Sequence, residues 1–237
     1  MTPFYQHNGI TIYCGDCLEV LLELSPDAIV TDPPYGLERF KKGFGFSRFK
    51  GYGAEKTGLK WDVKPDQATI KLLLKTGKYH IIWGANNFTL PPSESFLVWN
   101  KHQTVDNFAS AELAFSDIPS LPAKVYEYSI HKHNQSEKFH PTQKPVSLMR
   151  WCISFLPSDA KIICDPYMGS GTTLRAAQDM GLQAVGIELD EEYCQIAVQR
   201  LRQQSFSFPA RSTNNKNQPE LKSSAVVESH KQSKLNL

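Results

Sequence analysis

Two kinds of apolar pattern alternate along most of the chain. Short, nearly continuous apolar runs rich in β-branched residues predict buried strands, whereas apolar positions that recur every three or four residues predict amphipathic helices. The expected strands are residues 10–14, 28–31, 79–83, 96–99, 113–116, 125–130, 161–164 and 184–187. The expected helices are residues 18–24, 66–75, 146–155, 172–180 and 191–203. Because strands and helices alternate, the sequence predicts an α/β fold with a mainly parallel sheet flanked by helices.

Length and composition are those of one α/β domain followed by a polar tail. The chain has 237 residues, 41% of them apolar, which is enough to bury a sizeable core. The alternating pattern ends near residue 203, and residues 204–237 are rich in Ser, Asn, Gln and Lys without any period. Such a segment buries too little apolar surface to offset the entropy of ordering it. We therefore expect a single domain over residues 1–203 and a disordered tail over 204–237.

The sequence contains no signal for a membrane, a secretory route or a metal site. No apolar run approaches the ~20 residues that span a bilayer, and the N-terminus lacks a basic region followed by an apolar one. A soluble cytoplasmic protein is expected. The five cysteines are odd in number and scattered, which predicts reduced thiols. Cys14 and Cys17 have C-x-x-C spacing, but no second ligand pair accompanies them, so we expect no metal.

Residues 37–60 are strongly basic and aromatic. Seven Lys and Arg residues against two Glu give this segment a charge of +5, whereas the whole chain carries +2. Cations pair with phosphates and rings stack on unpaired bases, so the segment is typical of a loop that faces DNA. A solvated loop without a partner is the alternative, but such a loop would gain nothing from exposing five aromatic rings. The cations expected to bind DNA are Arg39, Lys41, Lys42, Arg48 and Lys50.

The predicted strand at 28–31 runs directly into Asp32-Pro33-Pro34-Tyr35. The two prolines fix φ and remove two backbone donors, so the turn is stiff and its carbonyl groups stay free. Open α/β sheets bind ligands at the carboxyl ends of their strands. There the Asp32 carboxylate and the Pro33 carbonyl can accept the two N–H groups of an exocyclic base amine, and Tyr35 can stack on a flipped base. A proline-rich turn with an aspartate cap is the alternative, and the tetrapeptide alone does not decide between them.

The predicted strand at 161–164 is followed by Asp-Pro-Tyr-Met-Gly-Ser-Gly-Thr-Thr at 165–173. The two glycines of this turn allow positive φ and close approach of a ligand to the backbone. Glu188 ends the next strand about 20 residues further on, where an acidic group can bind a ribose diol. A phosphate-binding loop would need a Lys after the second glycine, and a dinucleotide fingerprint would need a small residue in place of Leu174. S-adenosylmethionine, which has a ribose but no pyrophosphate, fits the pattern.

Taken in order, these stretches resemble the DNA amino-methyltransferases of the permuted β class, in which Asp-Pro-Pro-Tyr precedes the cofactor-binding glycine motif. Further matches are Gly15-Asp16, His-Pro-Thr-Gln-Lys-Pro at 140–145, and the segments 99–101 and 107–113. The resemblance covers residues 10–203, and its middle part is especially similar to small phage-type DNA methylases. It implies a Rossmann-like, S-adenosylmethionine-dependent methyltransferase fold in circularly permuted order, with double-stranded DNA as the substrate.

The resemblance also implies roles for individual residues. Residues 32–35 would form the catalytic turn. Asp16 would accept a hydrogen bond from the cofactor's adenine amine, Glu188 would bind its ribose, and Lys144 would meet its methionine carboxylate. The complete set implied for the cofactor site is Asp16, Thr142, Lys144, Asp165, Tyr167, Gly169, Ser170, Gly171, Thr172 and Glu188.

Two features concern recognition of the target base. Trp83 and Asn86 match a family segment beside the base pocket, although Ala85 and Asn87 stand where that segment commonly has Gly and Tyr. The target-recognition region is reduced to 117–139, so either sequence readout is modest or the basic loop shares it. The resemblance favours adenine N6 over cytosine N4, because the catalytic turn begins with aspartate rather than serine.

Other functions remain open on the sequence alone. Related Pro-Pro-Tyr chemistry includes methylation of RNA and of protein side-chain amides, but the permuted order and the basic loop favour DNA. A cofactor-binding DNA regulator without turnover is the non-enzymatic alternative, and the intact catalytic and glycine stretches speak against it. The oligomeric state and a paired restriction endonuclease cannot be inferred from the residues.

Overall fold

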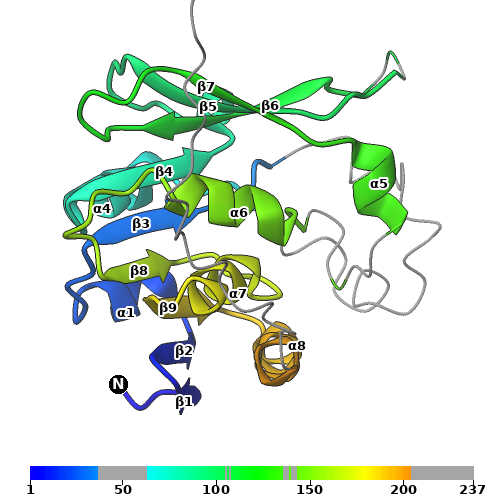
Figure 1. The fold of residues 1–237 in the computed structure, drawn as a ribbon. Coiled ribbons are helices and arrows are strands. Elements are labelled where there is room, and N and C mark those ends of the chain that lie inside the picture. The colour runs from blue at the N-terminus through cyan, green and yellow to red at the C-terminus, as the bar shows by residue number, and fades with distance from the viewer. Residues whose placement is uncertain (37–62, 105, 107, 136–138, 140–142, 204–237) are drawn as a thin grey trace, which may run out of the picture. The chain divides into compact units, whose positions relative to one another are not determined.

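The computed structural model describes residues 1–36, 63–104, 106, 108–135, 139 and 143–203. Within this part of the chain, nine strands form one mixed sheet in the order β1-β2-β9-β8-β3-β4-β6-β5-β7 (Figure 1). The strands are β1 Tyr5–His7, β2 Ile10–Cys14, β3 Ala28–Thr31, β4 Tyr79–Trp83, β5 Ser95–Asn100, β6 Ala111–Ser116, β7 Lys124–Glu127, β8 Ile162–Asp165 and β9 Gln183–Glu188. The helices are α1 Cys17–Leu21, α4 Gln67–Lys75, α5 Ile130–Gln135, α6 Val146–Ile153, α7 Thr172–Asp179 and α8 Glu191–Arg202, with a 3₁₀ turn, η1, at Ala85–Asn87.

The central strands β2, β9, β8, β3 and β4 run parallel to one another and are covered by helices on both faces. All four residues of β3 are buried. Ala28 and Val30 belong to a core cluster with residues of α6, α7 and α8, whereas Ile29 belongs to a second cluster with residues of α1 and α4. This helix–sheet–helix layering (Figure 1) confirms the predicted α/β fold and explains why β3 reads as a continuous apolar run.

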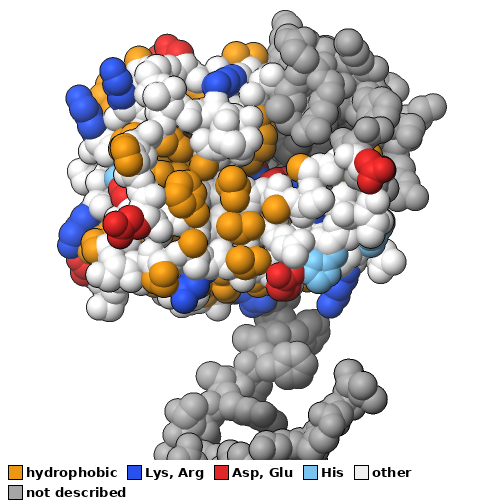
Figure 2. Space-filling view, turned by 90° about the horizontal axis from the view of Figure 1, so that it is seen from above, with side chains coloured by type: hydrophobic (Ala, Val, Ile, Leu, Met, Phe, Trp, Pro, Cys, Tyr) orange, Lys and Arg blue, Asp and Glu red, His pale blue; other side chains and the backbone are white. Residues whose placement is uncertain are grey.

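The strands β6, β5 and β7 extend the sheet beyond its parallel centre. β6 runs antiparallel to β4, β5 runs antiparallel to β6, and β7 runs parallel to β5. In β5, Leu97 and Trp99 are buried, while the residues that alternate with them are half-buried. Leu113 and Val125 are exposed on this part of the sheet. Figure 2 views the molecule from this side and shows apolar side chains gathered over these strands.

The predicted strands and helices are present, most of them within two residues of their expected ends. The strand predicted at 125–130 is wrong at its carboxyl end, because β7 ends at Glu127 and α5 begins at Ile130. The chain turns there: the Ser129 hydroxyl accepts a hydrogen bond from the His131 N–H, and the Ser129 carbonyl accepts one from the His133 N–H. A serine that caps a helix in this way outweighs the β preference of the tyrosine and isoleucine around it.

The short strand β1 was not predicted from the apolar pattern. It forms a hairpin with β2, and the register pairs His7 with Ile10. The two turn residues, Asn8 and Gly9, both have positive φ, of 47° and 77°. Asn-Gly is the commonest sequence for such a two-residue hairpin turn, so the signal was in the sequence although the strand itself is too short and polar to be recognised.

The helices of the described residues are all too short or too polar to span a bilayer. The five cysteines are free thiols. Among the described residues, no three His, Cys, Asp or Glu side chains are grouped closely enough to hold a metal ion.

Candidate functional site

Three candidate site residues lie at one edge of the sheet. Asp32 follows the last residue of β3, Asp165 ends β8, and Glu188 ends β9. β3 pairs parallel with β8, and β8 pairs parallel with β9, so the carboxyl ends of these strands meet. Open α/β sheets bind their ligands at this edge. The fold therefore brings together the proline turn and the glycine turn, which are far apart in the sequence.

Both carboxylate oxygens of Asp32 accept hydrogen bonds. Oδ1 accepts from the Tyr35 hydroxyl, and Oδ2 accepts from the Lys144 ammonium at 2.7 Å. The Lys144 Nζ also lies 3.3 Å from the Tyr35 hydroxyl oxygen. The Asp32 side chain is only 19% exposed. Because each carboxylate oxygen has two lone pairs, Asp32 retains the capacity to accept a further N–H group.

The Tyr35 ring is packed closely against the segment after β4. It lies edge-on to the Phe88 ring, with 6.2 Å between centroids. It also lies against Gly84, whose φ of +73° is in the left-handed region. A Cβ atom added at Gly84 would come within 2.1 Å of a Tyr35 ring carbon. Glycine is therefore required at this position both for its backbone conformation and for the space that the ring occupies.

We expect Gly84→Ala to displace Tyr35 and to destabilise the protein. Gly181→Ala is the matched control, because Gly181 has a similar φ of +70° but its added Cβ would meet nothing within 4 Å. Both variants lose the backbone freedom of glycine, and only the first adds a clash, which should cost about 1–3 kcal/mol more in the free energy of unfolding. Chemical denaturation of both variants measures the difference. Equal stabilities would contradict the packing described for Tyr35.

A buried chain of alternating charges surrounds Asp32. The Lys144 ammonium, 6% exposed, lies 2.7 Å from Asp32 Oδ2 and 2.8 Å from Glu112 Oε2. The other Glu112 oxygen pairs with the ammonium of Lys101. Glu112 is near the start of β6 and opposite Trp99 of β5, which places it at the same edge of the sheet as Asp32. The contact of Lys144 with two carboxylates was not predicted from the sequence.

The charges in this cluster shift each other's pKa values. Burial raises the pKa of Asp32, and the nearby Lys144 cation offsets only part of that effect. Burial acts in the same direction on Glu112, but the cations of Lys144 and Lys101 outweigh it and hold the pKa of Glu112 at about 2. For Lys144, the two carboxylates outweigh burial and keep its pKa above the ordinary range. Lys144 and Glu112 therefore both remain charged near neutral pH.

Asp165 is a buried acceptor that fixes the start of the glycine turn. Its carboxylate accepts hydrogen bonds from the Thr31 hydroxyl at 2.7 Å, from the Thr173 hydroxyl, and from the backbone N–H of Tyr167 at 3.1 Å. Burial raises its pKa to about 6, although these three donors act in the opposite direction. Thr31 belongs to β3 and Thr173 to α7, so the Asp165 side chain ties the glycine turn to the strand that carries Asp32.

Glu188 lies against the glycine turn on its other side. Its carboxylate accepts from the backbone N–H groups of Gly169 and Asp190, each at 3.0 Å. Burial raises the pKa of Glu188. Asp16 caps α1 through its bond to the Leu18 N–H, just after β2, whose last residue pairs with Glu188. The structure therefore places Asp16, Glu188 and Gly169 at the same sheet edge.

The glycine turn is also held by residues to which the sequence analysis gave no role. The Ser170 hydroxyl donates to the side-chain oxygen of Gln143 at 3.0 Å. The buried Arg200 donates to the Ser170 carbonyl and, at 2.8 Å, to its hydroxyl oxygen. Gly171 has the predicted positive φ, of 78°, and stands at the N-terminus of α7. Because Gln143 directly precedes Lys144, this network connects the glycine turn with the charges around Asp32.

Glu112, which lies in the matched segment 107–113, and Arg200 were given no role by the sequence analysis, but both carry recognisable signals. Glu112 is the one charged residue in the six-residue strand Ala111–Ser116. A charged side chain in such an apolar strand is rarely buried unless it is paired. Arg200 adjoins the buried helix positions Ala197 and Leu201. Both signals show that a charge is buried, but neither identifies its partner.

Other predicted site residues lie outside the described part of the chain. These are Thr142 and the five cations of the loop at 37–60, namely Arg39, Lys41, Lys42, Arg48 and Lys50. The tail at 204–237 also lies outside it.

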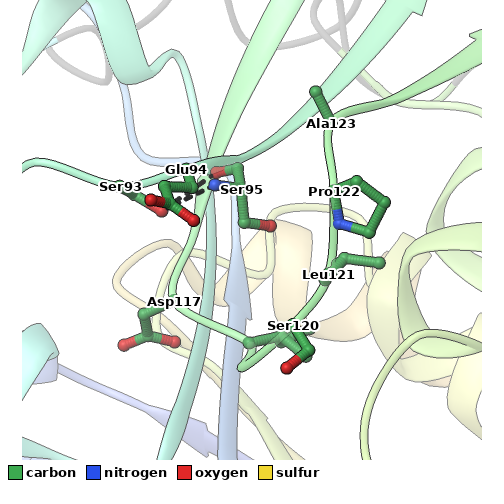
Figure 3. Close-up of a pocket in the computed structure, with 9 residues that line it drawn as sticks. Ser93, Glu94, Ser95, Asp117, Ser120, Leu121, Pro122 and Ala123 are labelled. Atoms are coloured by element: carbon green, nitrogen blue, oxygen red, sulfur yellow. Dashed lines mark hydrogen bonds between the residues drawn. The ribbon is translucent and has the colours of Figure 1, made fainter.

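A separate hollow lies at the opposite edge of the sheet. It is lined by residues 93–95 and by the loop that follows β6 (Figure 3). Ser95 pairs with Ser116, and the carboxylate of Asp117, which lines the hollow, accepts a hydrogen bond from the His80 N–H near the start of β4. The hollow is therefore near the amino ends of the parallel strands, away from Asp32 and Glu188, and does not belong to the candidate site.

Comparison with known proteins gives one family match and several similar chains. A sequence model of a family described as DNA methylase matches residues 78–199. The type II methyltransferase M.HpaI of Haemophilus parainfluenzae is 23% identical over 256 residues, covering 91% of this chain and 82% of that protein. The type II methyltransferase M.HinfI of Haemophilus influenzae is 24% identical over 250 residues, covering 81% and 68%.

Two solved structures share the fold. The complex of M1.HpyAVI with SAM matches with a TM-score of 0.54 and 24% identity, covering 81% of this chain and 99% of that chain. The PvuII DNA methyltransferase, described as cytosine-N4-specific, matches with a TM-score of 0.56 and 17% identity, covering 86% and 90%. These likenesses confirm the Rossmann-like methyltransferase fold that the sequence predicted.

Proposed function

The chain belongs to the DNA methylase family of N6 and N4 amino-methyltransferases, and from that premise we propose the reaction that it catalyses. It transfers a methyl group from S-adenosylmethionine to the exocyclic amine of a flipped base in double-stranded DNA, and that base is adenine. One observation carries the proposal. Asp32 is held on a stiff proline turn at the carboxyl edge of the sheet, next to β8, which leads into the glycine turn, and Glu188 ends the following strand, β9.

The residues at this edge fit the proposed cofactor. A Cβ added at Gly169 would meet nothing within 4 Å, so there is open space beside the turn. The Glu188 carboxylate borders Gly169 and can accept hydrogen bonds from a ribose diol. Asp16 has a second carboxylate oxygen beyond the one that caps α1, and this oxygen can accept from an adenine amine. S-adenosylmethionine bound here would supply an electrophilic sulfonium methyl group.

The chain's own residues activate the target amine. The lone pair of this nitrogen is delocalised into the base, which makes the amine a poor nucleophile. Hydrogen bonds from its two N–H groups to the Asp32 carboxylate and the Pro33 carbonyl favour a pyramidal nitrogen with its lone pair free for in-line attack. Tyr35 stacks on the flipped base and offsets part of the few kcal/mol that flipping costs. An aspartate rather than a serine at the first position of the turn supports adenine as the base.

The identity of the methylated base tests this proposal. Unmethylated duplex DNA is incubated with the protein and the cofactor, digested to nucleosides, and analysed by mass spectrometry. We expect N6-methyldeoxyadenosine. If N4-methyldeoxycytidine appears instead, the enzyme class stands and the choice of adenine is wrong. If neither product appears, the proposed reaction is refuted.

We further propose that the basic loop at 37–60 binds the DNA backbone. Neutralising Lys41, Lys42, Arg48 and Lys50 should weaken DNA binding nearly uniformly across sequences, because phosphate contacts position a protein without reading bases. Each phosphate contact that is lost should flatten the slope of log affinity against log salt by about 0.9. Fluorescence anisotropy at several salt concentrations measures this slope.

Two results would contradict this role of the loop. An unchanged slope with unchanged affinity would mean that the four cations are only solvated. An unchanged slope with altered target preference would mean that the loop reads bases, through its aromatic residues, and takes over work from the short segment at 117–139.

A further inference from the structure

The pairing of Lys144 with Asp32 leaves room for a further N–H group but weakens Asp32 as an acceptor. In the proposed reaction, on which this inference rests, the Asp32 carboxylate must accept an N–H from the target amine. In the structure, the Lys144 ammonium already donates to Oδ2 and the Tyr35 hydroxyl to Oδ1. The positive charge of Lys144, whose Nζ lies 2.7 Å from Asp32 Oδ2, partly neutralises the carboxylate. Asp32 is therefore a weaker hydrogen-bond acceptor for the neutral target amine.

Glu112 is placed to relieve this weakening. Asp32 Oδ2 accepts a hydrogen bond from Lys144 Nζ at 2.7 Å, whereas Glu112 Oε2 lies 2.8 Å from the same nitrogen as an ion pair without hydrogen-bond geometry. Glu112 therefore offers the ammonium a second acceptor that is only partly used. Glu112 comes from β6. Its second oxygen is neutralised by Lys101, so Glu112 can bind Lys144 without leaving an unpaired buried charge.

The aromatic surroundings favour the same arrangement. Lys144 Nζ lies 5.5 Å from the Trp83 ring centroid and 5.6 Å from the Tyr35 ring centroid. The Trp83 ring is fully buried. The ammonium therefore has a cation–π contact with Trp83 that does not depend on Tyr35.

We propose that Glu112 is a positioning residue for methyl transfer, which draws the Lys144 ammonium away from Asp32 when the target amine binds. Asp32 is then a strong hydrogen-bond acceptor for the target amine, while the Glu112 carboxylate balances the charge of Lys144. The ion pair between Lys101 and Glu112 keeps the Glu112 side chain in position. Glu112 does not touch the substrate and acts only through Lys144.

The test is the pH dependence of kcat for Glu112→Gln. The groups that face Asp32 are Lys144, Tyr35, Glu112 and, from β8, Asp165. Without the negative charge of Glu112, the Lys144 ammonium pairs only with Asp32. The Asp32 carboxylate is then stabilised, and the pKa of Asp32 falls. The acid limb of the kcat profile should move down by about one pH unit, and kcat at neutral pH should fall on the order of tenfold.

Two variants complete the design. Glu94→Gln removes an exposed carboxylate at the opposite sheet edge and should change neither kcat nor the acid limb. Glu112→Asp keeps the negative charge but places it one methylene group further from Lys144. Its kcat should therefore lie between those of Glu112→Gln and the wild type. It also serves as the test variant if Glu112→Gln does not fold, with smaller changes in the same directions.

The outcomes separate this inference from the proposed function. If the wild-type protein methylates no DNA amine, the proposed function fails and the inference fails with it. If the wild type is active and Glu112→Gln keeps its kcat and its acid limb, only the inference is overturned. A rise in the dissociation constant for S-adenosylmethionine with unchanged kcat would also overturn it, because Glu112 would then act on cofactor binding.

Discussion

Replacing Asp32 with alanine is expected to abolish methyl transfer while the cofactor still binds. Loss of one positioned acceptor at the reacting centre costs on the order of 10²-fold or more in rate. The variant should fold, because Lys144 keeps its second partner, Glu112, at 2.8 Å. Cofactor binding should be preserved, since Asp32 is placed to face the target amine, whereas Glu188 and Asp16 are placed to hold the cofactor. Turnover with labelled cofactor and affinity by calorimetry measure the two effects separately.

Asp32→Asn is the matched control for this variant. It keeps one acceptor oxygen toward the amine and removes the charge, so its rate should lie between those of the wild type and Asp32→Ala. Near-normal turnover of Asp32→Ala would eliminate the proposed activation of the amine.

Replacing Glu188 with alanine should have the opposite effect on the two measurements. A ribose diol left unpaired in a buried site costs about 1–3 kcal/mol, so the dissociation constant for S-adenosylmethionine should rise roughly 5- to 150-fold. The Glu188 carboxylate also accepts from the Gly169 N–H, so its loss should loosen the glycine turn that borders the cofactor. At saturating cofactor, kcat should remain close to that of the wild type.

Two controls show whether the change in cofactor affinity comes from the Glu188 carboxylate. Glu188→Gln keeps an acceptor of similar size, so its affinity should fall less than that of the alanine variant. A circular dichroism spectrum and a thermal transition like those of the wild type show that Glu188→Ala is folded. Unchanged affinity of the folded variant would remove Glu188 from the cofactor site.

The parallel centre of the sheet was predictable because its physical signal is strong. Strands such as β3 are buried on both faces and therefore consist of apolar residues throughout. The turns after β3 and β8 were equally clear, because proline restricts φ whereas glycine permits the positive φ that tight turns need. In the structure β3 and β8 pair parallel, so Asp32 and Asp165 lie at the same edge of the sheet.

The charges around Asp32 were not predictable in the same way. Lys144 itself lies in no helix or strand, so periodicity gives no direction for its side chain. Glu112 lies on β6, and its contact with Lys144 depends on the antiparallel pairing of β6 with β4. Sequence motifs identify which residues have chemistry, but the partner of a buried charge depends on packing between elements that are distant in the chain. The role of Arg200 at Ser170 was missed for the same reason.

The most direct test of the proposed function is transfer of a tritium-labelled methyl group from S-adenosylmethionine to three classes of acceptor, namely duplex DNA, RNA and protein. The wild-type protein and Asp32→Ala are measured side by side with each acceptor. We predict that label enters duplex DNA, that RNA and protein remain unlabelled, and that Asp32→Ala transfers none. Label in RNA or protein but not in DNA, or equal labelling of DNA by the two proteins, would contradict the account.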